Sequence, residues 1–413
     1  MVRLLLGASA ALLAAACQTS VRPDRDAEVE APETVSLHES MIVFDSHLDT
    51  PANFSDPAFD LLADNPTRLG QVQVDFPKME RGGLDGGFWV IFTPQGPLDD
   101  ASMRAARDAG LFRAVEIREQ AAKHDEFVLV TTADAAEAVA REGRKTMLVS
   151  MENAYPLMRD VSLLETYHRL GLRMVGPVHF RNNQFADSAT DITPVHGGLS
   201  PLGRDLVEEA NRLGMIVDGS HAADSSVRDI IALSTTPIIL SHTGVKAVFD
   251  HPRNIDDVLL KELADSGGVI QINAFGGYLE RLEPTPERAA ALAVWTEKYG
   301  DSVSDSPADR VEQAIADRRE IDSEFPPPRS TFEKFYEHLI HALDVIGPDH
   351  VGIGADWDGG GGTMGMEDVS DLPQITERLL ADGYSPEDIE KIWSGNMMRL
   401  LRAAEAAAEP VQP

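Results

Sequence analysis

The chain has 413 residues, with 36 lysines and arginines against 68 aspartates and glutamates, which gives a formal net charge of −32. A negative charge of this size argues against nucleic acids and anionic membrane surfaces as partners. The 43% content of hydrophobic residues is that of a globular protein and excludes a fully disordered chain. Cys17 is the single cysteine, so the chain can form no disulfide within itself and no thiolate-rich metal site.

The first 38 residues are predicted to lie outside the folded domain. Arg3 precedes an apolar run over residues 4–16 that is too short to span a bilayer and is typical of a signal peptide. The small residues before Cys17 resemble a bacterial lipoprotein signal with Cys17 as the lipidation site, and plain secretion after an Ala-x-Ala-like site is the alternative. We expect residues 1–16 to be removed and residues 17–38 to form a flexible acidic tether. The protein would then be exported, either secreted or held by its lipid on the bacterial membrane facing the periplasm.

From residue 41 the chain alternates short apolar runs with amphipathic helical patterns. Most of the runs are continuous, as expected for parallel strands that are buried on both faces. Eight of them cover residues 41–47, 87–92, 146–152, 173–179, 214–221, 237–242, 268–273 and 350–356. A ninth run at 127–130 is assigned to a peripheral strand or a helix extension. Helices are predicted between the strands, among them 101–123, 201–213, 254–266 and 331–346.

Eight strands that alternate with helices predict an α/β fold, a (β/α)8 TIM-like barrel formed as a single domain over residues 39–408. An open doubly wound sheet is the alternative, but no GxGxxG motif follows the first strand, which removes the usual reason for that fold. Residues 276–330 are charged and helix-prone, and they include three consecutive prolines. We expect them to form a helical insertion after the seventh strand, over the barrel mouth or at a contact between subunits.

Most of the predicted strands end in a polar residue that a buried strand does not need. The carboxyl ends of barrel strands surround one cavity, so these side chains are expected to share it. Each residue alone is more often structural, but the repetition on seven of eight strands favours a functional site. His338 and His341 show no such regularity and are expected on a helix surface. The strand-end residues are His47 with Asp49, Glu152, His179, His221, His242, Asn273 and Asp356.

Five of these residues can form a metal centre. His47 and Asp49 are two apart on a strand, so they point to the same side and can hold one ion. Glu152 can offer one oxygen to each of two ions, and His221 and His242 can hold the second. Imidazole and carboxylate ligands without thiolate suit catalytic zinc, with manganese or cobalt as substitutes. Two ions that share a carboxylate lower the pKa of a trapped water toward about 7, which predicts hydrolysis by a metal-bridging hydroxide.

Seven motifs occur in the order and local spacing of a known family. They are SHLDTP (46–51), SMEN (150–153), VHFRNNQFADS (178–188), GLSPLGRDLVEEANRLGMIVDGSH (198–221), LSHT (240–243), RNIDD (253–257) and GIGADWDG (352–359). Over roughly residues 41–402 the chain resembles the membrane (renal) dipeptidases, which are binuclear zinc peptidases with a metal-hydrolase barrel. The resemblance implies two zinc ions per chain, held by the five ligands named above.

The resemblance also implies roles for residues outside this ligand set. His179 would contact the carbonyl oxygen of the scissile bond, and Arg253 would pair with the free carboxylate of a dipeptide. Asp356 would carry a proton from the nucleophilic water to the leaving amine, and nearby cations are expected to lower its pKa. Asn273 is a further candidate for substrate binding. The family accepts D-residues at the C-terminal position, so small dipeptides are the expected substrates; homodimer formation is left open.

Two other functions remain open from the sequence. Other binuclear amidohydrolases, such as lactonases and deamidases, share the barrel and the use of metal. They usually begin with HxH and often bridge their ions with a carboxylated lysine, whereas this chain has HxD and Glu152. A non-catalytic peptide-binding lipoprotein would be favoured by the loss of a ligand or of Asp356, and all of these residues are present.

Overall fold

The computed structural model describes residues 37–67, 71–300 and 308–410 of the chain. Each of the nine predicted runs overlaps a strand, and all strand pairs are parallel. β3 pairs only with the first residues of β4, which confirms its peripheral place. The strands are β1 (Phe44–Leu48), β2 (Gly86–Phe92), β3 (Phe127–Leu129), β4 (Lys145–Glu152), β5 (Leu172–Val175), β6 (Ile216–Val217), β7 (Ile239–Thr243), β8 (Val269–Ile272) and β9 (Val351–Ile353).

Eight of these strands close into a ring. Hydrogen-bonded ladders give the order β1-β2-β4-β5-β6 in one sheet and β7-β8-β9 in another. A single parallel bridge joins Asp218, just after β6, to Ile239 of β7, and a second joins Leu48 of β1 to Trp357, shortly after β9. We call these two joins the seams of the barrel. The predicted (β/α)8 barrel is confirmed, with pairing reduced to one bridge at each seam.

At each seam a buried aspartate takes over part of the pairing between strands. Asp218 accepts a hydrogen bond from the N–H of Ser241 in β7 at 3.0 Å. Asp45 of β1 accepts one from the N–H of Ala355, beyond β9, also at 3.0 Å. Each donor lies on the far side of its seam, so each carboxylate acts as a main-chain carbonyl does in a regular ladder.

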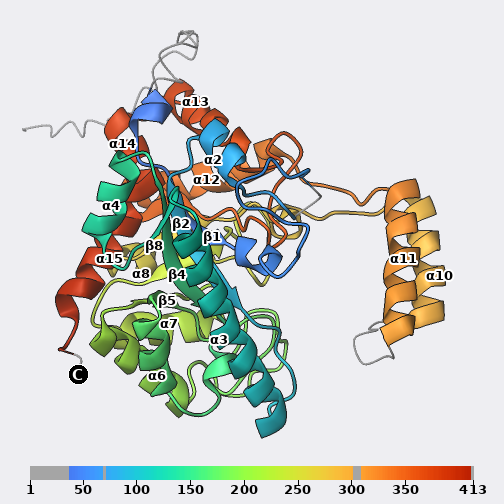
Figure 1. Cartoon of the computed structure of the whole chain (residues 1–413), viewed down its shortest axis with the longest axis horizontal. Coiled ribbons are helices and arrows are strands. Elements are labelled where there is room, and N and C mark those ends of the chain that lie inside the picture. Colours follow the sequence, from blue (N-terminus) through green and yellow to red (C-terminus); the bar gives the residue numbers. More distant parts are fainter. Residues whose placement is uncertain (1–36, 68–70, 301–307, 411–413) are drawn as a thin grey trace, which may run out of the picture.

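Helices lie around the strands (Figure 1). The four helices predicted above are confirmed, with ends that differ by a few residues. A turn of π-helix, η5 (Lys391–Gly395), leads into the last helix. The helices are α2 (Phe76–Gly82), α3 (Asp100–Lys123), α4 (Ala133–Arg141), α5 (Leu163–Arg169), α6 (Pro201–Leu213), α7 (Asp224–Leu233), α8 (Asp257–Asp265), α9 (Gly276–Leu279), α10 (Pro286–Tyr299), α11 (Ala308–Glu324), α12 (Phe332–Ile346), α13 (Pro373–Ala381), α14 (Pro386–Glu390) and α15 (Asn396–Ala407).

Helix α6 illustrates how local sequence sets these boundaries. The Ser200 side chain accepts a hydrogen bond from the N–H of Gly203, and Pro201 occupies the first turn, where its missing N–H costs nothing. Gly214 ends the helix in a left-handed conformation with φ of 73°. The chain then passes through buried Met215 into β6, and His221, the next strand-end residue, follows that strand.

The predicted insertion over residues 276–330 is helical, as expected. Helices α10 and α11 pack against each other as a hairpin that projects away from the barrel (Figure 1). Trp295 donates a hydrogen bond to the carbonyl of Ala314 at 2.9 Å, and Arg288 pairs with Asp322 at 2.7 Å. We expected the insertion over the barrel mouth, and this is wrong for the α10–α11 hairpin. Helix α9 does lie there, because its Tyr278 lines the central cavity. A role of the hairpin in subunit contact stays a prediction.

The predicted signal peptide, Cys17 and the tether up to residue 36 lie outside the described residues. His38, which we assigned to the end of the tether, is buried in the body of the protein. Its ring lies 2.7 Å from Thr376 Oγ1 and 2.9 Å from the carbonyl oxygen of Gly82. Within the described ranges, the helices lack the length and apolar character needed to cross a membrane.

Candidate metal centre

The predicted strand-end residues converge at the carboxyl ends of the barrel strands. They surround a cavity of about 320 Å³. His47 lies at the same centre, fully buried beside its neighbours, while Arg253 and Asn273 are not part of the lining. The lining consists of Asp49, Ala52, Phe92, Glu152, His179, Phe180, His221, His242, Phe275, Tyr278, Asp356, Asp358 and Gly359.

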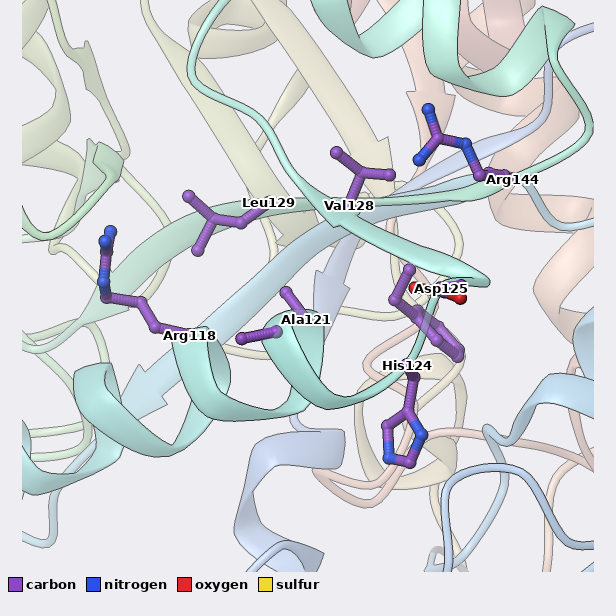
Figure 2. A pocket seen from close by; sticks show the side chains of 9 residues that line it. Arg118, Ala121, His124, Asp125, Val128, Leu129 and Arg144 are labelled. Carbon is purple, nitrogen blue, oxygen red and sulfur yellow. The ribbon is translucent and has the colours of Figure 1, made fainter.

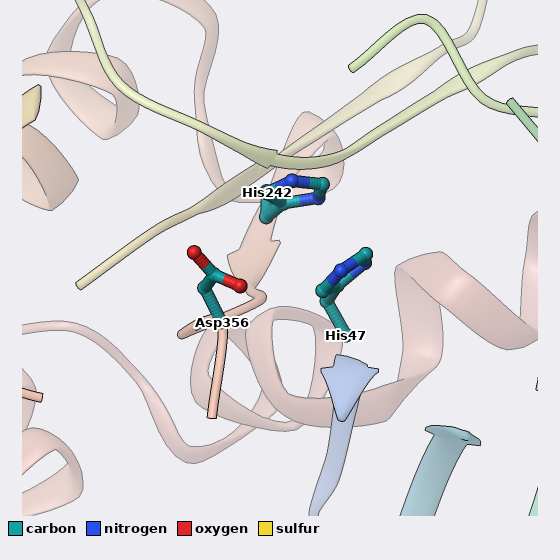
Figure 3. Close-up of side chains that lie close together, drawn as sticks. All are labelled: His47, His242 and Asp356. Atoms are coloured by element: carbon teal, nitrogen blue, oxygen red, sulfur yellow. The ribbon is translucent and has the colours of Figure 1, made fainter. Parts of the chain in front are cut away.

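Three overlapping groups of side chains have ligand atoms within 4.8 Å of one another. One consists of His47, Asp49 and Glu152, and another of Glu152, His221 and His242. These are the two predicted ligand sets, and Glu152 belongs to both. The third group joins His47 and His242 to Asp356, and Figure 3 shows these three side chains near one another. The structure thus brings together all five predicted ligands and the predicted proton carrier.

The two oxygens of Glu152 face different partners. Oε1 lies 2.8 Å from His221 Nε2 and 3.3 Å from His242 Nε2. Oε2 lies 3.8 Å from His47 Nε2, and that nitrogen is 3.5 Å from Asp49 Oδ2. This division of the carboxylate is what a bridging ligand between two cations needs.

The donor atoms fit divalent metal ions. His47 Nε2 is buried and has no hydrogen-bond partner among the described residues. His221 Nε2 and His242 Nε2 face each other at 2.9 Å, a contact in which two neutral rings can share only one proton. Buried polar atoms without partners are costly, and a shared cation would satisfy them. A donor set of imidazole nitrogen and carboxylate oxygen suits zinc among the common metals.

Burial and charge set the protonation of the ligands. Burial lowers the pKa of His221 and His242 well below the usual range, so both rings are neutral, the form that coordinates metal. At His47 burial opposes protonation, but Asp49 and Glu152 raise the pKa to about 10. A proton on His47 therefore supplies positive charge that the surrounding carboxylates attract. Burial also raises the pKa of Glu152 well above its ordinary value.

His179 lies at the edge of this centre between two aromatic rings. Its Nε2 is 3.6 Å from Glu152 Oε1, and its ring centroid is 4.9 Å from that of Phe92 and 3.8 Å from that of Phe180. Burial, with a smaller contribution from the positive charge of Arg253, lowers the pKa of His179 to about 3. A neutral imidazole beside the ligands can donate a hydrogen bond to a substrate carbonyl oxygen.

Asp356 lines the cavity in a left-handed conformation with φ of 64°. Nearby cations were expected to lower the pKa of Asp356, but the charged side chains of the protein do not produce that lowering. Burial raises the pKa to about 7, because the cost of burying the charge exceeds the attraction of His47 and Arg253. Sequence reasoning foresaw the neighbouring cations but not the depth of burial.

Arg253 and Asn273 lie behind the cavity wall. Arg253 is 2% exposed and donates hydrogen bonds to Thr243 Oγ1 at 2.9 Å and to the carbonyl of His242 at 2.7 Å. Its guanidinium carbon is 5.6 Å from the centroid of Tyr278, a cavity residue. Arg253 Nε and both amide atoms of Asn273 are buried without a hydrogen-bond partner among the described residues. Their roles in binding substrate stay predictions.

Sequence reasoning missed the residues that support the ligands, and it misplaced His338. Asp218 and Ser241 contact each other behind His242, at 2.5 Å between Oδ2 and Oγ. The signal for them was the Ser-His dipeptide, which recurs at 46–47, 220–221 and 241–242. His338 is fully buried rather than at the surface, and its Nε2 lies 3.0 Å from the carbonyl oxygen of Leu279.

A second hollow, of about 410 Å³, lies between the end of α3 and β3 (Figure 2). Because β3 pairs with the first residues of β4, this hollow is at the amino ends of the strands. Barrel active sites lie at the other end. Its polar lining residues are Arg118, His124, Asp125 and Arg144, and none of them belongs to a group of potential metal ligands in the described structure.

The chain is similar to known dipeptidases. A model of the membrane dipeptidase family, peptidase family M19, matches residues 32–413. Dipeptidase tcpJ of Claviceps purpurea is 31% identical over 351 residues, which cover 83% of this chain and 72% of that protein. The solved structure of the probable dipeptidase PvdM from Pseudomonas aeruginosa superposes with a TM-score of 0.79 at 30% identity, covering 91% of this chain and 98% of that one.

A second solved structure adds a ligand. It is a metallopeptidase from Rhodobacter sphaeroides bound to a phosphinate mimic of L-Ala-D-Ala, which superposes with a TM-score of 0.69 at 25% identity. The match covers 88% of this chain and 99% of that one. Together with the convergent ligands, these matches show that the chain belongs to the membrane dipeptidase family, peptidase family M19, and is a peptide-bond hydrolase of the metallo-dipeptidase class.

Proposed function

We propose that this protein is an exported dipeptidase that uses two zinc ions and accepts D-residues at the C-terminal position of its substrate. The observation that carries the two-ion proposal is the division of Glu152, whose oxygens face His221 and His242 on one side and His47 on the other. Two zinc ions held there would supply an activated water and would polarise the scissile carbonyl. The remaining steps belong to side chains of the chain itself.

His179 and Asp356 are placed for proton and charge handling. Neutral His179 donates a hydrogen bond to the carbonyl oxygen, whose negative charge grows as the water attacks. Asp356 accepts the proton of that water and gives it to the leaving amine. Both side chains line the cavity, and Asp356 belongs to one group of potential metal ligands with His47 and His242.

We infer from the strand order how a dipeptide would lie in the cavity. Arg253 follows β7, and in the ring β7 lies across from β2, which ends in the cavity residue Phe92. A substrate carboxylate attracted by Arg253 would lie at the Tyr278 side of the cavity. The N-terminal residue would then extend toward Phe92. A cavity of about 320 Å³ is at the small end of the range for ligand pockets, which supports a small substrate such as a dipeptide.

The proposals on substrate stereochemistry, cellular location and homodimer formation rest on other observations. The Rhodobacter sphaeroides neighbour was crystallised with a mimic of L-Ala-D-Ala, which supports acceptance of a C-terminal D-residue. The apolar run before Cys17 supports export, with Cys17 carrying a lipid in the periplasm. The hairpin of α10 and α11 is the surface that we propose for homodimer contact.

The test is hydrolysis of L,L and L,D dipeptides by zinc-loaded protein, with the metal content measured on the same sample. We expect two zinc ions per chain and cleavage of both series. The control substrates are tripeptides and simple lactones. Cleavage of lactones without cleavage of any dipeptide would place the enzyme with other amidohydrolases, and one ion per chain would contradict the bridging role of Glu152.

A further inference from the structure

A chain of three buried side chains leads from a carboxylate to one of the metal ligands. Asp218 Oδ2 lies 2.5 Å from Ser241 Oγ, and that oxygen lies 2.9 Å from His242 Nδ1. All three residues are at most 4% exposed. Asp218 Oδ1 accepts hydrogen bonds from the N–H groups of Ser220 at 2.9 Å and Ser241 at 3.0 Å.

The direction of each hydrogen bond follows from the donor inventory. A carboxylate only accepts, so the single proton of the Ser241 hydroxyl points to Asp218. Ser241 Oγ can then only accept from the two rings that it faces, His242 Nδ1 at 2.9 Å and His47 Nδ1 at 3.5 Å, and the shorter contact requires the ring proton of His242 on Nδ1. His242 Nε2 is left with a free lone pair, and this atom faces Glu152 Oε1 at 3.3 Å and His221 Nε2 at 2.9 Å.

We propose that Asp218 is a positioning residue that fixes the ring tautomer of His242 through Ser241. Partners on the second ring nitrogen commonly orient metal-bound histidines, and here a serine stands between the carboxylate and the ring. The same carboxylate receives the Ser220 N–H, just before His221, which has a left-handed φ of 64°. Asp218 therefore supports both histidines of the second ligand set, one through its ring and one through its backbone. The inference rests on the proposed metal centre, and the substrate does not enter it.

Asp218→Asn gives the sharpest test because it can reverse the chain of hydrogen bonds. The Asn oxygen can still accept the two backbone N–H groups. Its amide nitrogen would donate to Ser241 Oγ, so the Ser241 hydroxyl would donate to His242 Nδ1. The ring proton would then move to Nε2 and occupy the lone pair that faces the metal position. A wrong tautomer of this kind is known to disable catalytic histidines.

The measurement is two-bond ¹H–¹⁵N NMR of metal-free protein labelled at histidine, with His242 identified by the signal lost in His242→Gln. We expect the Nδ1–H form in the wild type and the Nε2–H form in Asp218→Asn. Competition with a chelator should show the affinity of one zinc site reduced about 10–100-fold in that variant, with the other site within a few fold. Ser241→Ala, which keeps both backbone hydrogen bonds of Asp218, should give a mixture of tautomers.

Asp45→Asn is the matched control. Asp45 is likewise buried at the other seam and accepts hydrogen bonds from the His47 and Ala355 N–H groups, and no hydrogen bond joins it to a histidine ring nitrogen in the described structure. Its loss should lower thermal stability and leave the His242 tautomer unchanged. An unchanged tautomer in Asp218→Asn or a single Nδ1–H form in Ser241→Ala would overturn the proposal. Should Asp218→Asn not fold, Ser241→Ala decides. A correct tautomer in wild-type protein that binds no zinc would refute the metal centre alone.

Discussion

Replacing Asp356 with asparagine should separate proton transfer from metal binding. Asparagine has nearly the same size and tolerates the left-handed φ of 64° at this position, so the backbone of the loop should be preserved. The substitution removes the ability to accept a proton from the water and return it to the leaving amine. General acid–base assistance is worth about 10²–10⁴-fold in rate, or about 3–5 kcal/mol of barrier.

The assay is steady-state hydrolysis of one good dipeptide, with the metal content determined in parallel. We expect kcat to fall by that factor while KM changes little, because the lost interaction is made only in the transition state. Asp356 also lies within ligand distance of His47 and His242, so a role as a metal ligand is the rival reading. In that case the variant would lose metal together with activity.

Asp358→Asn is the matched control for this experiment. Asp358 lines the same cavity and also has a left-handed φ, of 66°. Its two oxygens accept hydrogen bonds from Thr50 Oγ1 at 2.6 Å and from the Gln73 N–H at 2.7 Å. Its replacement should lower the melting temperature and change kcat by only a few fold. A kcat within a few fold of the wild type in Asp356→Asn, with full metal content, would refute the proton-carrier assignment.

The remaining predictions concern the bridge, the carboxylate partner and a buried histidine. Glu152→Ala should lower the occupancy of both metal sites, and full metal content by elemental analysis would exclude the bridging role. Arg253→Ala should lower kcat/KM for free dipeptides by an amount equivalent to about 2–5 kcal/mol, and Thr243→Val, which keeps the charge of Arg253, should lower it less. Equal cleavage of free and C-terminally amidated dipeptides by the wild type would contradict the pairing of Arg253 with the substrate carboxylate. Burial lowers the pKa of His338 to about 4 from an ordinary 6.5, so its contribution to stability is complete above pH 6.5 and is lost as the pH falls toward 4, because the unfolded chain takes up the proton first. Between pH 7 and 4.5 the wild type should therefore lose about 2–3 kcal/mol more than His338→Gln in urea unfolding, and equal losses would refute the assignment.

The barrel could be predicted from the sequence because its strands carry their own signal. Continuous apolar runs that end in polar residues mark strands buried on both faces, and their carboxyl ends must meet. The metal ligands followed from the same pattern. The run over 214–221 contains only the two residues of β6, because Asp218 makes a single bridge and the chain then turns toward His221, whose φ is left-handed; a pattern of apolar residues does not show that turn.

Other features depend on distant contacts that one sequence does not display. The α10–α11 hairpin projects away from the barrel, and its many charged residues would suit any surface position, so the sequence does not predict its direction. His338 was misplaced because its burial depends on Gly244, where an added Cβ would lie 3.1 Å from His338 Nδ1. The pKa of Asp356 follows from the depth of its burial, which spacing along the chain cannot measure.

The seams give metal binding a consequence for folding. His221 follows β6 and His242 lies near the end of β7, the two strands that meet at a seam where the Gly219 N–H bonds to the carbonyl of Ile239 at 2.8 Å. An ion held by both histidines would cross-link the ring at one of its two single-bridge joins, so metal binding would stabilise the closed barrel. Metal at 100 times its dissociation constant stabilises the folded state by about 2.7 kcal/mol. If the Gly219 amide exchanges only when the metal site opens, bound metal should slow its hydrogen exchange about 100-fold. Without bound metal, this seam would then open more often than the rest of the ring.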